Sequence, residues 1–320
     1  MTSHVESARL DRDDLREFEH HAVLFDSAEH LRRTAVPRLR SALRRGEHAV
    51  LAVADPTRDV LLAGLGAADA ARVHVADHAG FYDAPGRTLA ALHRRARAEH
   101  PRRVLVVGEP PLPLSEPMPL REWHRLDSAL AGALAETRLG MLCLHDVRGL
   151  PEVVVRTVRR THPVLLTPDR ELASPDYTDP AVFSAADLAR PLPAPTGAQL
   201  RMDITADLGA LRGRFADLAA RADVPGERRD DLVLAVNELA ANVVEHGGGS
   251  GVVALWRRPG WVVCDVLDHG GELRDPLSGY HPADPYSPRG YGLWITRQLC
   301  DFMEIRATAQ GTLIRLHLRG

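Results

Sequence analysis

Lysine is absent from this chain of 320 residues, and all 40 of its basic side chains are arginine. Chemistry that needs a lysine amine is therefore excluded, including Schiff-base catalysis and the phosphate-binding lysine of a P-loop. The net charge is −3, and the arginines are interspersed among acidic residues. Because no basic stripe forms, the sequence argues against direct binding of nucleic acid.

Cysteine is scarce, and long apolar runs are missing. Cys143, Cys264 and Cys300 lie in separate apolar segments, with neither a disulfide framework nor the spacing of zinc ligands. We expect them to be core residues of a cytoplasmic protein. No apolar run is long enough to span a membrane, and the first residues lack the core of a signal peptide. At 45% hydrophobic residues, the chain is expected to be soluble, with two domains.

Residues 230–247 (DDLVLAVNELAANVVEHG) show the apolar spacing of an amphipathic helix, and Gly247 is expected to end it. Packing does not explain Glu238, Asn242 and His246, which recur every four residues and so share one face. A carboxylate and a carboxamide one turn apart can position a hydroxyl and hold Mg²⁺ for phosphoryl transfer. Taken alone, the helix favours a solvated polar edge over a phosphoryl-transfer site, because polar triplets at helical spacing are common.

Residues 260–271 (GWVVCDVLDHGG) are typical of a strand that opens into a glycine loop. Alternation places Asp268 on the face that the helix should cover, where its carboxylate can accept a hydrogen bond from an exocyclic amine. Such a charged hydrogen bond contributes about 1.5 to 3 kcal/mol. Residues 289–301 then place Gly290 and Gly292 before a second helix, where backbone N–H groups can approach phosphate oxygens.

Together these pieces carry a family resemblance. The motifs are E-x-x-x-N at Glu238 and Asn242, D-x-G at Asp268 and Gly270, G-x-G-L from Gly290 to Leu293, and Gly311-Thr312 before a last strand. In this order they resemble the N, G1, G2 and G3 boxes of the GHKL ATPases, with the closest fit to the anti-sigma factor and serine protein kinase branch. The resemblance covers residues 199–320 and implies a Bergerat-type, two-layer α+β sandwich with a mixed sheet.

The resemblance implies a site for ATP and Mg²⁺. Glu238 would be the catalytic base, Asn242 the Mg²⁺ ligand and Asp268 the residue that reads adenine. The other expected nucleotide contacts are His246, Gly270, Gly290, Gly292, Leu293 and Thr312. One position departs from the family pattern, because Glu272 stands where a second glycine is expected. The segment 272–288, with four prolines, is expected to be a lid or a surface loop.

The first half of the chain alternates strands with helices. Continuous apolar strands in this order predict a mostly parallel sheet covered on both faces, in a three-layer α/β domain. The expected strands are 20–25, 48–53, 72–75, 103–107 and 141–144, and the expected helices are 26–45, 56–65, 88–100, 121–137 and 151–160. Pro37 predicts a kink or a restart in the first helix.

Polar side chains follow several of these strands. A pocket could gather Glu109, Trp123, His145 and Asp146, although residues at strand ends more often only anchor loops. The segments HHAVLFDSAEHL, FYDAPGRTLAAL, REWHRLDSAL and LCLHDVRGLP resemble a MEDS sensory domain over residues 19–165. That domain is similar in fold to RecA-like ATPases without their phosphate loop, and the resemblance implies sensing of a small organic ligand.

Residues 166–198 are rich in proline and are expected to be a semi-stiff linker, and residues 1–18 a polar tail. The order of domains resembles RsbA-like anti-sigma regulatory proteins. It implies a partner-switching regulator that phosphorylates an anti-sigma antagonist or sequesters a sigma factor under sensory control. A binding module with a vestigial nucleotide site is the alternative, and a sensor histidine kinase ranks below both. The oligomeric state stays open, with a homodimer as one option.

Overall fold

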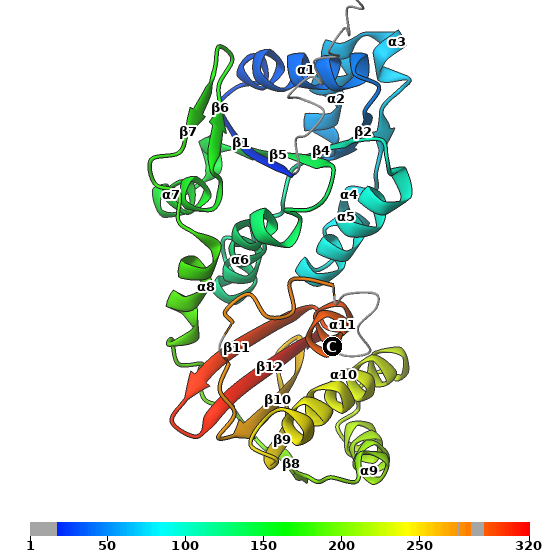
Figure 1. The fold of residues 1–320 in the computed structure, drawn as a ribbon, viewed down its shortest axis with the longest axis vertical. Helices are drawn as coiled ribbons and strands as arrows, with labels where there is room; N and C mark the ends of the chain where they lie inside the picture. The colour runs from blue at the N-terminus through cyan, green and yellow to red at the C-terminus, as the bar shows by residue number, and fades with distance from the viewer. Residues whose placement is uncertain (1–17, 274, 283–290) are drawn as a thin grey trace, which may run out of the picture.

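The computed structural model of the chain describes residues 18–273, 275–282 and 291–320. Two sheets, each with its own helices, follow one another along the long axis of the molecule (Figure 1). Gly290, most of the expected lid after His281, and the expected polar tail up to residue 17 lie outside the described residues. Among the residues described, no helix combines the length and the apolarity needed to cross a membrane.

Sheet A belongs to the first half of the chain and is parallel except at one edge. Its strands, in spatial order, are β3 (His74–Val75), β2 (His48–Ala52), β4 (Val104–Gly108), β5 (Leu139–Asp146), β1 (Glu19–Phe25), β6 (Val164–Leu166) and β7 (Glu171–Ala173). The central strands are apolar and buried, as strands covered on both faces must be. The expected mostly parallel α/β sheet is confirmed, whereas the finer likeness to RecA stays a prediction.

Helices lie on both faces of sheet A (Figure 1). One face packs against α1 (Ala28–Arg44) and α2 (Asp55–Leu65), and the other against α5 (Pro85–Glu99) and α6 (Pro117–Ala133). The first half of the chain also contains the shorter elements α3 (Ala67–Ala70), α4 (His78–Phe81), η2 (Val147–Gly149) and α7 (Glu152–Thr161).

Two of these helices contain proline, α1 in its interior and α6 in its first turn. Helix α1 begins after Ser27, whose Oγ accepts from the backbone N–H of His30 at 3.2 Å, and it runs through Pro37 without restarting. Helix α6 begins at Pro117, four residues before the expected start. Proline is favourable in the first turn, where its missing N–H would have no partner in the helix.

Sheet B belongs to the second half and is antiparallel throughout its described strands. In spatial order they are β11 (Phe302–Thr308), β12 (Gly311–Arg319), β10 (Trp261–His269), β9 (Gly251–Arg258) and β8 (Leu200–Ile204). The expectation of a mixed sheet was wrong. β11 does run parallel to β10, but β12 returns in a hairpin and lies between them, so no two neighbouring strands are parallel.

One face of sheet B is covered by α9 (Leu208–Arg221), α10 (Gly226–Glu245) and α11 (Gly292–Leu299). Val262, Cys264 and Val266 belong to the same core as α10, which confirms the predicted alternation in β10. Helix α10 begins at Gly226, a turn before the expected start at Asp230. Pro225 occupies the N-cap position, with a φ of −54° and a ψ of 142°.

The other face of sheet B packs against the first half of the chain, so the two halves share a core. Trp256, Trp261 and Phe302 of sheet B lie in one cluster with Trp123 of α6 and Tyr82. An isolated two-layer sandwich was expected. In the whole chain, a third layer made by α6 and α8 (Pro180–Leu188) contacts β11 (Figure 1).

The segment expected to be a linker is partly folded into this third layer. It contains β7, which adds to sheet A, and α8, which is capped by Asp179 and packs against α6 and β11. Asp187 of α8 pairs with the buried Arg125 of α6 at 2.8 Å. Residues 166–198 therefore hold the two halves together instead of separating them.

Buried ion pairs cross between the two halves. Arg121 of α6 pairs with Glu304 of β11 at 3.2 Å, and Glu304 also accepts from Arg306 and His317. Burial would raise the pKa of Glu304, but these partners lower it from 4.5 to about 2. Its contribution to stability is therefore fully present above pH 4.5 and is lost as the pH falls through about 2.

Gly86 tests the contact between the halves. A Cβ at this position in α5 would lie 1.9 Å from the backbone oxygen of Arg297 in α11. We expect Gly86→Ala to lower the free energy of unfolding by about 1 to 3 kcal/mol through overpacking. Gly213→Ala in α9, where a Cβ meets nothing within 4 Å, is the matched control and should be neutral or stabilising by up to about 1 kcal/mol. Equal effects of both substitutions in denaturant unfolding would contradict the tight contact.

Candidate functional site

A cavity of about 430 Å³ lies between α10, sheet B and the N-terminus of α11. Its apolar lining comes from both the helices and the sheet, and its polar lining includes several of the residues singled out in the sequence. The sequence-predicted residues in its wall are Asn242, His246, Asp268, Gly292, Leu293 and Thr312. The structure thus gathers into one cavity residues that are up to 70 positions apart in the chain.

Glu238 and Asn242 lie one turn apart on α10, and both are half-buried. Gly292, the first residue of α11, lies against them. A Cβ on Gly292 would be 3.1 Å from the side-chain nitrogen of Asn242 and 3.4 Å from a carboxylate oxygen of Glu238. The absence of a side chain at Gly292 therefore lets the N-terminal end of α11 approach the carboxylate and the carboxamide directly.

Asp268, near the end of β10, sits in a cradle of glycines. Its Oδ1 accepts from the backbone N–H of Gly248 at 2.8 Å. A Cβ on Gly247 or on Gly271 would lie 2.0 or 1.9 Å from Oδ2. Only glycine fits at these two positions while the carboxylate keeps its place. The two glycines therefore allow the Asp268 carboxylate to line the cavity.

Thr312, Gly270 and Gly271 lie beside Asp268 where β10 ends. Thr312 faces Asp268 across the β10–β12 pair, and its hydroxyl donates to the backbone oxygen of Gly271 at 2.9 Å. Gly270 has a φ of +78° and donates to the backbone oxygen of Gln310 at 2.9 Å. Gly270 thus shapes the turn next to the cavity, whereas Thr312 lines it.

His246 follows the last helical residue of α10 and is exposed, so it closes the row formed with Glu238 and Asn242 at the solvent end. Leu293 lines the cavity and packs against the core under α10. Gly290 lies outside the described residues. Glu272, at the position where the resembling family has glycine, also lines the cavity.

The cavity fits an adenine nucleotide. Apolar side chains of Leu239, Val243 and Ile314 offer a surface for a planar ring, and Asp268 offers a charged acceptor among them. The lining also carries the carboxylates of Glu272 and Asp275, so a polyphosphate bound there needs a compensating cation. Asn242 is the residue that would hold Mg²⁺ through its amide oxygen, and bound Mg²⁺ would neutralise phosphate charge.

The pocket considered at the strand ends of sheet A does not form from the expected residues. Glu109 accepts from the backbone N–H of Ala54 at 2.9 Å, and Asp146 pairs with Arg148 at 2.5 Å. His145 is buried, and Trp123, also buried, lines a different cavity of about 420 Å³ together with His78 and Tyr82. The two carboxylates thus anchor loops, which is the more common role of such residues.

Comparison with known families gives two matches along the chain. Residues 203–318 match the sequence model of the histidine kinase-like ATPase domain. Residues 19–163 match that of MEDS, the methanogen/methylotroph, DcmR sensory domain. The chain carries a MEDS domain followed by a histidine kinase-like ATPase domain. The match to the ATPase domain implies ATP binding, and the cavity lies within the matched residues.

Comparison with whole proteins adds less. No curated protein matches the chain. Among solved structures, the RsbU and RsbW domains of Rv1364c from Mycobacterium tuberculosis share 23% sequence identity over 38% of this chain, with a TM-score of 0.29. The match spans 32% of that protein.

Helix α11 connects the ATPase cavity with the MEDS domain. Its N-terminal Gly292 touches Asn242, while its C-terminal carbonyls accept from Arg87 of α5, with Nη1 at 3.1 Å from Gln298 O and 3.3 Å from Cys300 O. Arg87 also pairs with the buried Asp301 at 2.7 Å. A cation at a helix C-terminus is stabilising, so the MEDS domain holds the far end of the helix that forms the cavity wall.

The loop of residues 275–282 is also held between the two domains. Tyr280 is buried, and the guanidinium of Arg297 lies 3.9 Å from its ring centre. Leu277 packs beside Gly132 of α6, and Ser278 accepts through its backbone oxygen from Arg297 at 3.3 Å. This first part of the expected lid lines the cavity and touches the MEDS domain at the same time.

The glycine cradle of Asp268 can be tested by nucleotide binding. Gly271→Ala should displace the Asp268 carboxylate and weaken ATP binding about tenfold or more, which corresponds to about 1.4 kcal/mol. Asp268→Asn should weaken it similarly through loss of a charged acceptor. Calorimetric titration of ATP measures both, with Gly213→Ala as the folded control. Unchanged affinity in both variants would show that Asp268 does not contact the nucleotide.

Proposed function

We propose that the chain is a partner-switching regulator. Its ATPase domain binds ATP with Mg²⁺ and transfers the terminal phosphoryl group to a serine of an anti-sigma antagonist, or holds a sigma factor, under control of the MEDS domain. The observation that carries the proposal is the placement of Glu238 and Asn242 against Gly292, beside the cavity that contains Asp268. Both the resemblance to the anti-sigma kinase branch and the domain order support it.

Each residue then has one chemical role. ATP would supply the phosphoryl group, and Asn242 would hold the Mg²⁺ that neutralises phosphate charge. Glu238, half-buried next to the N-terminus of α11, orients the serine hydroxyl and accepts its proton. Asp268 selects adenine by accepting from its exocyclic amine. Phosphoryl transfer needs mainly such positioning and charge stabilisation, and these groups provide both.

Control by the MEDS domain is supported by two contacts. Arg87 and Gly86 hold α11 at its C-terminal end, and α6 holds the loop around Leu277. Both contacts are part-buried and join the MEDS domain directly to segments that line the nucleotide cavity, so a change in α5 or α6 can be passed to its wall. The MEDS resemblance suggests that a small organic ligand causes such a change.

A second candidate is a module that binds its partner protein without phosphoryl transfer. Glu272 favours it, because this carboxylate lines the cavity where the resembling family has glycine. A negative side chain near bound phosphates disfavours their close approach. Both candidates share the partner class, a sigma factor or its antagonist, and differ only in catalysis.

Glu238 and Asn242 separate the two candidates. Glu238→Gln keeps the shape of the side chain and removes the base, so ATP affinity should stay nearly unchanged while phosphoryl transfer falls by about 100-fold or more. Asn242→Ala should instead weaken Mg²⁺-dependent ATP binding itself. The measurement is transfer of radiolabelled phosphate to candidate antagonist proteins, together with calorimetric titration of ATP.

Sigma-factor retention on the immobilised protein supplies the control for this experiment. Loss of transfer in Glu238→Gln, with sigma-factor binding intact, supports the kinase. Transfer by neither wild type nor variants, with equal sigma-factor retention in all three, supports the binding module and removes the kinase.

Arg87 tests the coupling between the domains. Arg87→Ala removes the hydrogen bonds to the C-terminus of α11 and the pair with Asp301, so hydrogen exchange in α11 and in residues 275–282 should speed up. The affinity for ATP should change together with these exchange rates. Arg58→Ala is the matched control, because Arg58 pairs with Asp55 and Asp59 on the outer helix α2. Identical exchange in both variants would remove the structural basis for sensory control.

A further inference from the structure

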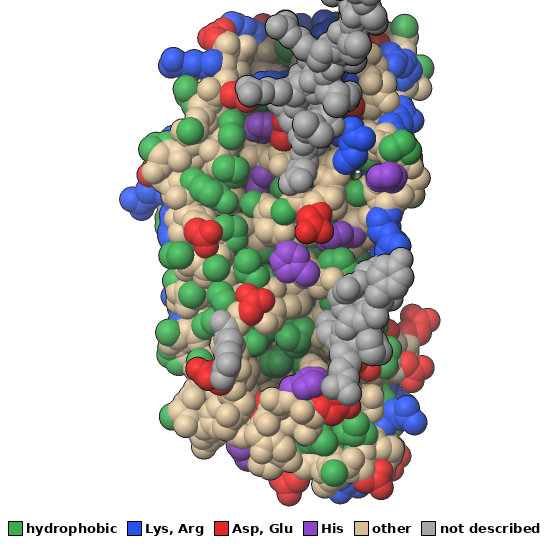
Figure 2. All heavy atoms as spheres, in the orientation of Figure 1, with side chains coloured by type: hydrophobic (Ala, Val, Ile, Leu, Met, Phe, Trp, Pro, Cys, Tyr) green, Lys and Arg blue, Asp and Glu red, His purple; other side chains and the backbone are tan. Residues whose placement is uncertain are grey.

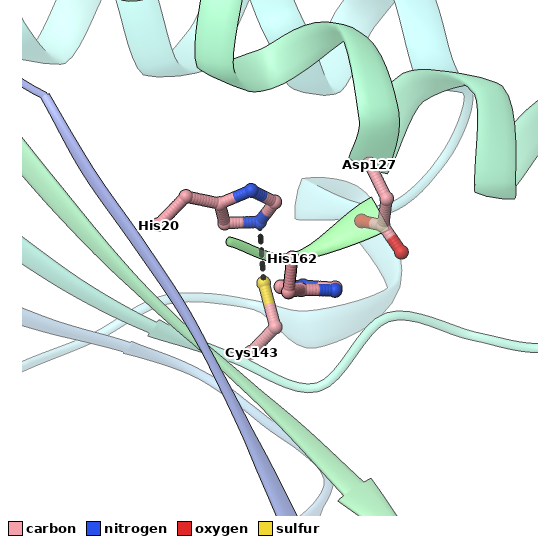
Figure 3. A group of neighbouring side chains, drawn as sticks. All are labelled: His20, Asp127, Cys143 and His162. Carbon is pink, nitrogen blue, oxygen red and sulfur yellow. Dashed lines mark hydrogen bonds between the residues drawn. The ribbon is translucent and has the colours of Figure 1, made fainter. Parts of the chain in front are cut away.

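Four buried side chains meet between sheet A and α6 in the MEDS domain (Figure 3). They are His20 of β1, Asp127 of α6, Cys143 of β5 and His162, which lies between α7 and β6. One donor atom from each residue lies within 4.8 Å of the donors of the other three. This cluster lies in the MEDS domain, apart from the residues of the nucleotide cavity.

The fold brings them together through the register of neighbouring strands. β1 and β5 are parallel neighbours in which His20 faces Met141 and Ala22 faces Cys143. Alternation therefore directs His20 and Cys143 to the same face of the sheet, the one that α6 covers. The chain then returns through α7, so that His162 reaches the same place from the start of β6.

The donor atoms are available for a ligand. Nδ1 of His162 donates to the backbone oxygen of Val158 at 2.8 Å, which leaves the lone pair of Nε2 free, and this buried nitrogen has no hydrogen-bond partner. Oδ2 of Asp127 is equally buried and without a partner. A histidine whose second nitrogen donates to a backbone carbonyl is oriented in the way typical of metal ligands.

The spacing of the atoms also matches a tetrahedral metal ion. Ligand atoms at 2.0 to 2.3 Å from such a centre lie roughly 3.3 to 3.8 Å apart. Nε2 of His20 lies 3.4 Å from Sγ of Cys143, within this range. All four donor atoms lie within 4.8 Å of one another, so a tetrahedral site requires only a small contraction of the group.

Burial makes this group costly without a ligand. All four side chains are enclosed in the core, and buried polar atoms without partners are destabilising. Two imidazoles, a thiolate and a carboxylate are the donors that Zn²⁺ prefers, whereas Mg²⁺ and Ca²⁺ require mainly oxygen ligands. Four protein ligands around one ion form a closed site of the structural type.

We propose that His20, Asp127, Cys143 and His162 bind one divalent transition-metal ion, with Zn²⁺ as the best match to the donor set. The ion ties β1, β5 and the segment before β6 to α6. Arg121 on α6 pairs with Glu304 of the ATPase domain, and so the metal also fixes the helix that contacts sheet B. Binding releases the Cys143 thiol proton, because the thiolate is the ligand.

Cobalt substitution in the full-length protein tests the proposal. After removal of metal with a chelator, titration with Co²⁺ should show saturation at one equivalent and a thiolate-to-cobalt charge-transfer band, which Zn²⁺ then displaces. Cys143→Ala should abolish the band, and Asp127→Asn should weaken metal binding about 10-fold or more. Cys264→Ala is the matched control, since Cys264 is an equally buried thiol in the ATPase domain.

A second variant keeps the test decisive if Cys143→Ala does not fold. In Cys264→Ala/Cys300→Ala, Cys143 is the remaining cysteine of the chain, and the band must persist there with the same stoichiometry. Absence of a charge-transfer band in the wild type overturns the proposal. So does a band that survives Cys143→Ala, or one that disappears when Cys264 and Cys300 are replaced.

Discussion

The close contact between α5 and α11 is the constraint on which the arrangement of this protein depends. Gly86 has no room for a side chain against Arg297, and Arg87 donates to the carbonyls that end α11. Asp301 accepts both from Arg87 and from Arg228 of α10. Helix α11 therefore forms part of the wall of the nucleotide cavity. At its C-terminal end it is hydrogen-bonded to α5 of the MEDS domain and, through Asp301, to α10 of the ATPase domain.

Inside the cavity, as at Gly86, glycine allows close contacts that a side chain would prevent. Close approach of backbone to side chain occurs at Gly292 beside Asn242 and at Gly247 and Gly271 beside Asp268. The carboxamide of Asn242 and the carboxylate of Asp268 thus both lie against positions where a Cβ would be crowded or would collide. Gly270 of the sequence motif has the other role of glycine, because the turn requires its φ of +78° while a Cβ there would meet nothing within 4 Å.

In the MEDS domain, the interior is organised by polar groups as well as by apolar packing. The covered face of β1 and β5 places His20 and Cys143 under α6, and the same helix carries Arg121 to the ATPase domain. Arginine and acidic side chains both lie on the molecular face shown in Figure 2. Specific ion pairs join the two domains, such as Arg87 with the buried Asp301. Helix α6 therefore packs both in the interior of the MEDS domain and against sheet B.

The sequence by itself determined the elements and the nucleotide residues that are local in the chain. The spacing of Glu238 and Asn242 and the alternation that ends at Asp268 follow from helical and strand periodicity, which a short segment contains in full. Tertiary structure alone decided the rest: the antiparallel order of sheet B, the folding of residues 166–198 onto α6, and the meeting of His20 with Cys143. These depend on strand pairing and on helix packing between segments distant in the chain, 50 residues apart for Asp265 and Arg315, 62 for Arg125 and Asp187, and 123 for His20 and Cys143. No local pattern specifies which distant surface will cover a given face.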